Sequence, residues 1–495
     1  MFILMVVIFV LGYTAIALEH PIRIDKAASA LLIGVLTWVV YIVGSTDILN
    51  LGFSSAWEEF IINHPDENNH EGMLYFIAHH EVLYHLGEIS SILFFLLGAM
   101  TIVEIVDQHN GFKIITDKIQ TTKKVKLLWI LSVLTFFMSA ALDNLTTTIV
   151  MVALLRKIID DKKTRWFYAS MVVLAANAGG AWSPIGDVTT IMLWIGGQVT
   201  TVNIITYVIF PSLVTMVVPL VLLTFSMKGN VTRPVEAEKD NGEYEGISAL
   251  QRNFIFCFGV ACLLFVPVFK TLTHLPPYLG MLQGLALLWI ITEIMHRSKK
   301  KANRPNLTVI NILRKVDVPT VLFFLGILSA VASLQSAGQL RLLADFLDEN
   351  LGNIYSINLA IGVLSSIVDN VPLVAGAMGM YPTISPEMLS ALPVAEQAYA
   401  SAFMVDGLFW QFLAYCAGTG GSILIIGSAA GVAAMGMEKI DFIWYLKKIS
   451  LLAILGPTFL TSFFWPSNSP KTNSICHRIK ANWQRNIPQS ALNKK

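Results

Sequence analysis

Three aspartates lie inside long apolar stretches of the sequence, where a charged side chain is costly. Asp143 and Asp369 are each followed by an asparagine, and Asp187 follows a segment rich in glycine. A carboxylate at the centre of a bilayer costs about 2.5–3.5 kcal/mol on insertion scales, so such residues are retained mainly where they handle ions or protons. Burial disfavours the charged carboxylate while a nearby cation favours it, so a proton and a cation can compete for one aspartate.

Hydroxyl and amide side chains accompany these aspartates and could complete an oxygen-lined site for a hard cation. The predicted cation- and proton-binding residues are Asp143, Asn144, Thr146, Thr147, Asn177, Ser183, Asp187, Thr189, Asp369, Asn370, Ser422 and Ser428. Asp187 has no acidic counterpart in the second half of this set. We therefore expect Asp143 and Asp187 to be the principal ligands of the cation.

Structural roles for the same residue types stay open at this point. A buried aspartate can bond to neighbouring backbone and stabilise a bend, and a helical threonine can bond back to the preceding turn. Glycines can simply allow close packing of helices. His79, His80, Glu81 and His85 lie close together, but their spacing does not match the HExxH zinc motif. A solvated loop and a pH sensor are the remaining interpretations of that cluster.

The composition of the chain is that of an integral membrane protein. Of 495 residues, 55% are apolar and only 14% are charged, with a mean hydropathy of +0.64. Soluble domains carry roughly 25% charged residues. The 34 basic and 33 acidic residues nearly cancel, so no nucleic-acid partner is indicated. The four cysteines are scattered and match neither a metal-binding spacing nor a disulfide framework.

Eight segments have the length and composition of simple membrane-spanning helices, which need roughly 20 apolar residues. They are residues 1–18, 27–44, 86–106, 203–227, 253–269, 278–296, 318–336 and 442–465. The first segment lacks a basic lead and a small-residue cleavage site, which favours a retained span over a signal peptide.

Loop charges predict the orientation of these spans. The loops after the first, third and sixth segments are basic, whereas residues 45–81 contain seven acids and no lysine or arginine. The positive-inside rule then places the basic loops in the cytoplasm and the N-terminus outside. The basic tail, 466–495, falls outside on this map, against the rule.

Two stretches with an Asp-Asn pair at their centre predict re-entrant hairpins. A single helix over 127–155 would be about 44 Å long, against about 30 Å of hydrocarbon, and both of its flanks are basic. We therefore expect a hairpin that enters and leaves from the cytoplasm, with Asp143-Asn144 at its tip. The stretch 356–380 has acidic flanks, which predicts a hairpin that enters from outside with Asp369-Asn370 at its tip.

Two other stretches predict helices that are broken inside the membrane. Glycines and Pro184 interrupt 166–194, and glycines interrupt 397–436 at two places. Proline removes a backbone donor, and broken helices in membranes occur where they line a polar cavity.

The Asp-Asn tip and the Gly-Gly break occur twice in the same order. Asp143-Asn144 matches Asp369-Asn370 at an offset of 226, and Gly179-Gly180 matches Gly420-Gly421 at an offset of 241. The first copy has basic flanks and the second has acidic flanks. This pattern predicts an inverted-topology repeat, and paired broken segments indicate the binding site of a transporter.

Several motifs resemble those of the NhaD family of sodium/proton antiporters. They are Ser139-Ala-Ala-Leu-Asp143-Asn144, Asn177-Ala-Gly-Gly-Ala-Trp-Ser-Pro-Ile-Gly-Asp187, Ser366-Ile-Val-Asp369-Asn370-Val-Pro372, Ala17-Leu-Glu-His-Pro21 and His85-Leu-Gly-Glu-Ile89. The resemblance covers about residues 1–465. It implies a secondary transporter, not an enzyme, that exchanges Na⁺ and also Li⁺ for H⁺ without a cofactor. It also implies a homodimer with an elevator-like motion in the lipid of a bacterial cytoplasmic (inner) membrane.

The expected fold is an all-α polytopic membrane protein with an inverted-topology repeat, in which each half carries a re-entrant hairpin and a broken transmembrane helix. The expected units are scaffold spans in 1–126, the first transport repeat in 127–202, linking and scaffold spans in 203–355, the second transport repeat in 356–436, a last span in 437–465 and the basic tail in 466–495. The NhaD family resembles a wider ion transporter superfamily, and one alternative is a dicarboxylate or arsenite-like anion carrier of that superfamily. Another alternative is an ion channel. Asp143 and Asp369 at the tips argue against an anion.

Overall fold

The computed structural model describes residues 1–17, 19–116, 118–233, 248–297, 308–367 and 369–456. This part of the chain is helical and contains no strand, only two isolated β-bridges. Seven of its helical segments are long and apolar enough to cross a membrane: Lys26–Val43, His70–Gln108, Lys124–Leu142, Thr201–Ser226, Ala249–Thr273, Pro277–His296 and Val318–Ser336. The expected all-α, multi-pass membrane protein is therefore confirmed.

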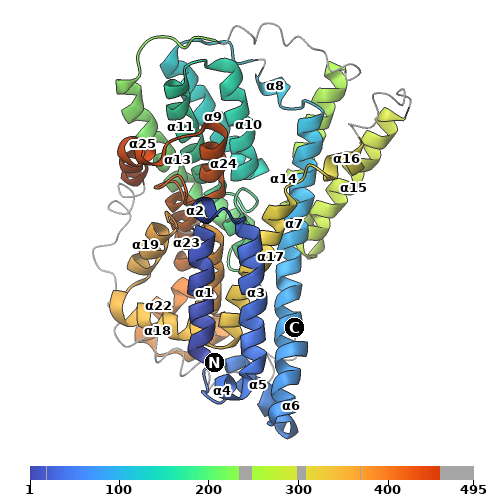
Figure 1. Cartoon of the computed structure of the whole chain (residues 1–495), viewed down its shortest axis with the longest axis vertical. Helices are drawn as coiled ribbons and strands as arrows, with labels where there is room; N and C mark the ends of the chain where they lie inside the picture. Colours follow the sequence, from blue (N-terminus) through green and yellow to red (C-terminus); the bar gives the residue numbers. More distant parts are fainter. Residues whose placement is uncertain (18, 117, 234–247, 298–307, 368, 457–495) are drawn as a thin grey trace.

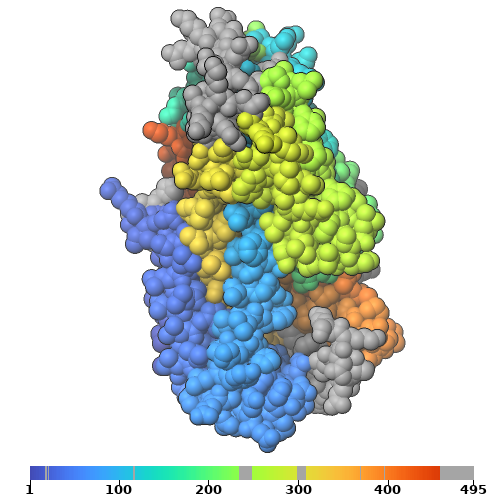
Figure 2. All heavy atoms as spheres, turned by 90° about the vertical axis from the view of Figure 1, so that its right-hand side faces the viewer, coloured from blue at the N-terminus to red at the C-terminus, as the bar shows by residue number. Residues whose placement is uncertain are grey.

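A first group of helices packs along one side of the molecule. It consists of α1 (Phe2–Ala17), α3 (Lys26–Val43), α7 (Val82–Gln108), α14 (Ala249–Thr273), α15 (Pro277–His296) and α17 (Val318–Ser336). α17 and α1 pack on α3, while α14 and α15 pack on each other and on α7. Figure 2 shows α7 running along this face, with α14 and α15 beside its upper part.

A second group contains the helices that carry the predicted site. It consists of α9 (Lys124–Leu142), α10 (Asn144–Ile158), α11 (Lys162–Ala181), α12 (Val188–Ile195), α13 (Thr201–Ser226), α19 (Ile354–Leu364), α20 (Asn370–Met380), α23 (Leu408–Gly420) and α24 (Ala429–Glu438). In Figure 1, α9, α10 and α11 occupy the upper half of the molecule and α19 lies in the lower half. α13 belongs with this group, since it packs on α9, α11 and α23.

An Asp-Asn motif joins α9 to α10, and another joins α19 to α20. In each pair, the second helix ends close to where the first helix starts. At the start of α9, Lys123 forms a β-bridge with Asn230, and after α10 the Asp160 N–H donates to the Thr232 carbonyl. After α20, the Tyr381 hydroxyl donates to Asp348 at 3.1 Å, and Asp348 comes shortly before α19. The chain therefore reverses at each motif.

The two halves of the second group are interleaved. α10 of the first half packs on α24 of the second, and α12 of the first half packs on α20 of the second. α11 also packs on α23, so the unbroken parts of the two interrupted helices are in contact. The two Asp-Asn motifs and the breaks after α11 and α23 are thereby brought to the middle of the molecule.

Shorter helices connect the members of these two groups. They are α2 (Glu19–Ile22), α4 (Ser45–Leu49), α5 (Ser55–Asn63), α6 (His70–Tyr75), α8 (Lys113–Thr116), α16 (Val309–Leu313), α18 (Gln339–Leu351), α21 (Pro386–Ala391), α22 (Val394–Ala400) and α25 (Phe442–Lys448), with 3-10 turns at Pro65–Glu67 and Ser401–Phe403. A π-helical turn, Phe76–Glu81, joins α6 to α7.

Two expected boundaries differ in the structure. The predicted broken stretch 397–436 begins later, because α22 and a 3-10 turn precede α23, which starts at Leu408. In the predicted span 442–465, α25 ends at Lys448 and residues 450–456 are helical, while the rest lies outside the described residues. The tail 466–495 lies outside them as well.

Candidate functional site

Each of the four central interruptions begins a helix with a polar capping residue. Asp143 caps α10, Asp187 caps α12, Asp369 caps α20 and Ser428 caps α24, each accepting a hydrogen bond from a backbone N–H of the new helix. Aspartate and serine are favoured at this position because the first N–H groups of a helix have no partner within it. The same sequence features that break the helices therefore also start the next ones.

Asp187 joins both tips at a single carboxylate. Its Oδ2 accepts a hydrogen bond from Asn144 Nδ2 at 3.0 Å and from Asn370 Nδ2 at 3.3 Å. Its Oδ1 accepts from the Thr189 N–H at 3.0 Å. The residue is 1% exposed, so the carboxylate is shielded from bulk solvent and held by amide donors.

Asn177 links the first half of the site to the second. Its Oδ1 accepts from Asn144 Nδ2 at 3.0 Å, and its Nδ2 donates to Ser422 Oγ and Ser428 Oγ at 2.9 Å each. The residue is fully buried. One continuous network therefore contains six of the predicted residues, three from each half: Asn144, Asn177, Asp187, Asn370, Ser422 and Ser428.

Asp143 lies at the first tip with its carboxylate on its own helix. Its two oxygens accept from the Thr146 N–H at 2.7 Å and the Thr146 hydroxyl at 2.8 Å. Its φ of +85° falls in the region that favours glycine. Such strain in a non-glycine residue costs of order 1–3 kcal/mol and gathers at functional sites. At the second tip, Asp369 accepts from the Val371 N–H at 3.2 Å.

The other predicted residues take more local positions. The Ser183 hydroxyl donates to the Ala140 carbonyl at 2.5 Å, which ties the break after α11 to the end of α9. Thr189 contributes its N–H to Asp187, as described above. The Thr147 hydroxyl is buried without a hydrogen-bond partner among the described residues. A buried hydroxyl of this kind is a ready ligand for an ion or water.

Equivalent contacts recur in the two halves at the offsets found in the sequence. Ser139 Oγ donates to the Ala176 carbonyl at 2.6 Å, and Ser365 Oγ donates to the Ala417 carbonyl at 2.8 Å. These serines are 226 residues apart and the two acceptors are 241 apart. Each half therefore holds its first hairpin helix against its interrupted helix in the same way.

Two glycines allow the same close approach. A Cβ at Gly179 would lie 2.2 Å from the Phe136 carbonyl oxygen, and one at Gly420 would lie 2.2 Å from the Gly362 carbonyl oxygen. Both collisions involve backbone, which a side-chain rotation cannot relieve. The Gly-Gly motif thus lets each interrupted helix touch its hairpin.

Several groups that support the site were not predicted from the sequence. The Tyr445 hydroxyl donates to the Ser422 carbonyl at 2.8 Å. At the far end of α24, the buried carboxylate of Glu438 accepts from Arg156 Nε at 2.7 Å and from Arg165 Nε at 2.9 Å. This ion-pair cluster ties α24 to α10 and α11. These partners are hundreds of residues apart, and only the acidic residue in an apolar stretch could have drawn attention to it.

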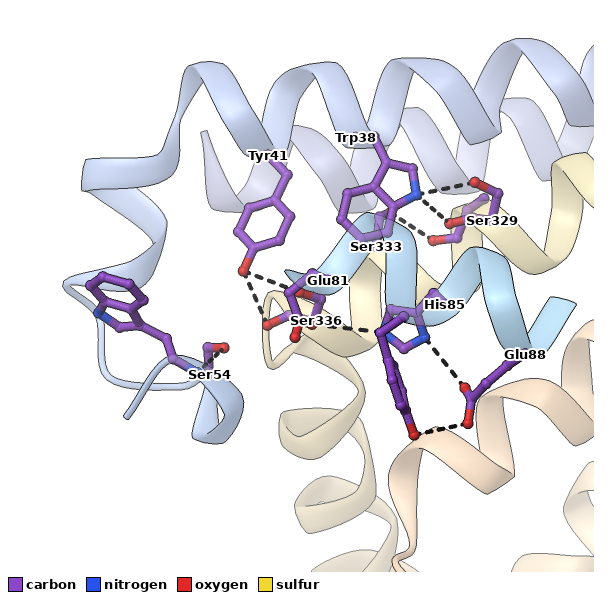
Figure 3. A network of polar contacts seen from close by, with 12 residues as sticks. Trp38, Tyr41, Ser54, Glu81, His85, Glu88, Ser329, Ser333 and Ser336 are labelled. Carbon is purple, nitrogen blue, oxygen red and sulfur yellow. Dashed lines mark hydrogen bonds and ion pairs between the residues drawn. The ribbon is translucent and has the colours of Figure 1, made fainter. Parts of the chain in front are cut away.

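A separate polar network lies among α3, α7 and α17 of the first group and the π-helical turn before α7. His85 lies 3.7 Å from Glu81 and 3.6 Å from Glu88, and the Tyr84 hydroxyl donates to Glu88 at 2.9 Å (Figure 3). Nearby, the Tyr41 hydroxyl donates to the Ser336 carbonyl at 3.2 Å.

A cavity of about 260 Å³ adjoins this network. Its walls come from residues 53–56 at the start of α5, the π-helical turn, α7, α17, α18 and the end of α20, and they include Glu81, His85 and Arg341. None of the twelve predicted site residues lines it. Within the described residues, no group of three His, Cys, Asp or Glu side chains could hold a metal ion, so the zinc interpretation gains no support.

Comparison with known proteins connects this arrangement to transporters. A family model described as "Citrate transporter" matches residues 3–404. Sodium/proton antiporter 1 of Arabidopsis thaliana is 45% identical over 454 residues, which cover 91% of this chain and 70% of that protein. Sodium/proton antiporter 2 of the same plant is 42% identical, with 92% and 97% covered. The Na⁺/H⁺ antiporter NhaD of Alkalimonas amylolytica is 28% identical, with 88% and 84% covered.

Proposed function

Because the chain belongs to the citrate transporter family and is an NhaD-type member of it, we propose that it exchanges Na⁺ for H⁺ across a membrane. The relatives named above are sodium/proton antiporters, which supports this substrate pair. The family consists of transporters, so its members move solutes rather than catalyse a reaction. Li⁺, a smaller hard cation, is proposed as a second substrate.

The observation that carries the proposal is the buried carboxylate of Asp187 at the meeting point of both tips. An anionic group that is 1% exposed needs a compensating charge or proton when its surroundings are apolar. Na⁺ and H⁺ are both able to supply it, and each excludes the other. Amide groups of Asn144 and Asn370 can turn an oxygen toward a cation or an N–H toward the bare carboxylate.

Exchange follows if the site opens to one side of the membrane at a time. We propose that the second group of helices moves as a unit against the first, which forms a scaffold and a homodimer interface in the lipid. The interleaving of α10 with α24 and of α12 with α20 supports a single rigid unit. On each side of the membrane, Na⁺ would then leave the site only when H⁺ replaces it, and H⁺ only when Na⁺ replaces it.

We also propose an inverted-topology repeat with re-entrant hairpins at Asp143 and Asp369. The recurrence of equivalent contacts at offsets of 226 and 241 supports the repeat. The return of both hairpins to their starting ends supports the re-entrant form. The loop charges support a cytoplasmic entry for the first hairpin, an outer entry for the second and an outer N-terminus. We propose a bacterial inner membrane as the location, as in the bacterium that carries the NhaD relative.

Purified protein in proteoliposomes with an internal pH dye tests this function. We expect external Na⁺ and Li⁺ to drive H⁺ movement, while K⁺, citrate and dicarboxylates do not. The name of the matching family makes citrate the necessary comparison, but the carboxylates of Asp143 and Asp187 would repel an anion. Na⁺ flux without coupled H⁺ movement would indicate a channel, and a response to citrate alone would overturn the proposal.

A further inference from the structure

Gly418 of α23 occupies the position in the second half that Asn177 occupies in the first. The two residues are 241 apart, which is also the separation of Ala181 from Ser422 and of Asp187 from Ser428. The same offset relates the equivalent contacts between the hairpins and the interrupted helices. The surroundings of Asn177 and Gly418 can therefore be compared residue by residue.

The two positions face equivalent neighbours with opposite chemistry. Asn177 Nδ2 donates to the hydroxyls of Ser422 and Ser428 at 2.9 Å each. A Cβ placed on Gly418 would lie 3.0 Å from the Ala181 Cβ and 3.8 Å from Asp187 Oδ2. One half therefore presents an amide donor to two neutral hydroxyls. The other half presents bare backbone to a carboxylate.

The Asp187 carboxylate is a stronger acceptor than the serine hydroxyls. Nevertheless, the hydroxyls face an amide side chain on the interrupted helix opposite them, and the carboxylate does not. The oxygens of Ser422 and Ser428 are satisfied by partial positive charge on the Asn177 amide. Asp187 Oδ2 receives amides from both tips, Asn144 and Asn370, but only a glycine faces it from α23. A cation beside this oxygen would give the second half a positive group in the place that the Asn177 amide takes in the first. A side chain at position 418 would compete with the cation for that space.

We infer that the transported cation binds Asp187 on the side of Gly418, in the place equivalent to the Asn177 amide, and that the missing side chain sets the size of the cation. This inference rests on the proposed Na⁺/H⁺ exchange and adds the position of the ion and a residue that determines specificity. Gly418 touches no proton in this scheme. It keeps one side of the carboxylate open.

A packing role for Gly418 is the competing explanation. A substitution at Ala181 distinguishes that role from an effect on cation binding. The 3.0 Å approach to the Ala181 Cβ is tighter than an ordinary contact, so Gly418→Ala alone could disturb α11 against α23. Removing the opposing methyl in Ala181→Gly/Gly418→Ala relieves that contact. The added methyl still lies next to Asp187 in the double variant, so an effect that survives comes from the site and not from packing.

The experiment measures the KM for Na⁺ and for Li⁺ of full-length protein in proteoliposomes, together with thermal stability. A single methyl in a fitted pocket changes affinity by about tenfold or more. We expect Ala181→Gly/Gly418→Ala to regain wild-type stability while its Na⁺ KM stays about tenfold raised. We expect its Li⁺ KM to rise less, because Li⁺ is smaller. Gly376→Ala on α20, where a Cβ meets nothing within 4 Å, is the matched control and should behave as wild type.

Each outcome bears on a different claim. A double variant with wild-type KM values for both ions would show that Gly418 serves packing alone and would overturn this inference. Equal rises for Na⁺ and Li⁺ would also overturn the size-setting role. A wild-type protein that exchanges neither ion would instead remove the proposed function itself, so the two failures are distinguishable.

Discussion

Asp187 makes two different kinds of contact with its two carboxylate oxygens. Its Oδ1 caps α12 through Thr189, which fixes where the helix begins, and its Oδ2 faces the two tip asparagines. In the proposed exchange, the cap holds the carboxylate in place while its other oxygen changes partners. A residue with only a structural role would need the first oxygen alone.

Replacing Asp187 separates these roles. We expect Asp187→Asn to keep the fold, because an amide oxygen can still accept the Thr189 N–H, but to abolish exchange, because the amide neither takes up nor releases a proton at neutral pH. Asp187→Glu should retain a small fraction of the activity with a raised Na⁺ KM. The measurement is Na⁺-driven ΔpH in proteoliposomes with equal protein content. Exchange near the wild-type level in Asp187→Asn would contradict the mechanism.

The sequence identified much of this site because a membrane makes polar residues conspicuous. Asp143, Asp187 and Asp369 stand out in apolar surroundings, and the doubled motif predicted offsets at which real contacts recur. The convergence of Asn144 and Asn370 on one carboxylate was not predictable, since it depends on how the two halves interleave. Gly418 was predicted only as one of the glycines that interrupt 397–436, because the role proposed for it lies in a side chain that is absent.

At the scale of elements, the cluster around Glu438 ties the two halves together. The carboxylate is buried, and its partners Arg156 and Arg165 come from the end of α10 and the start of α11. The Trp166 indole also donates to the Glu438 carbonyl at 3.1 Å, which satisfies the end of α24. Since α24 is capped by Ser428 in the site, both ends of the helix are held, the start by Ser428 and the end by this cluster.

Removing the charge of Glu438 should weaken the whole assembly. Breaking a buried ion pair by removing one partner costs roughly 3–5 kcal/mol, and the half-exposed Arg156 places the expected loss near the lower end, at about 3 kcal/mol. We expect Glu438→Gln to melt at a clearly lower temperature in detergent, with partial recovery in Glu438→Asp. Glu387→Gln, at an exposed acid outside the cluster, should leave the melting temperature unchanged.

The direction from which each hairpin enters is a second property of elements, and single cysteines measure it. Lys126→Cys and Asp160→Cys flank the first hairpin at exposed positions, and Asn350→Cys and Glu387→Cys flank the second. In a cysteine-free background, the first pair should react with an impermeant reagent only from the cytoplasm and the second pair only from outside. Labelling of Lys126→Cys and Asp160→Cys from opposite faces would make 127–155 a crossing span and exclude the inverted repeat.

Two groups of helices make up most of the molecule, and in the proposed exchange the contact between them changes. α20 of the second group packs on α17 of the first, and α12 packs on α7. The boundary is tight at Gly379 of α20, where a Cβ would lie 2.8 Å from Gln335 Oε1 on α17. A link across this boundary should therefore stop any motion of one group against the other.

A cysteine pair at this boundary tests the motion directly. Gln335→Cys shortens one of the two side chains that oppose Gly379, and the other, Leu340, approaches with its movable Cδ1 end. The thiols of Gln335→Cys/Gly379→Cys should therefore react with a short bifunctional cross-linker in a cysteine-free background. We expect cross-linking to abolish Na⁺/H⁺ exchange and a reducing agent to restore it. Trp129→Cys/Thr224→Cys is the control, because the Trp129 indole donates to the Thr224 hydroxyl at 3.0 Å within the second group. That link joins α9 to α13, which move together in this scheme, so exchange should survive it. Full activity of the cross-linked Gln335→Cys/Gly379→Cys protein, with the link verified by mass spectrometry, would mean that the ion reaches both sides without relative motion of the two groups.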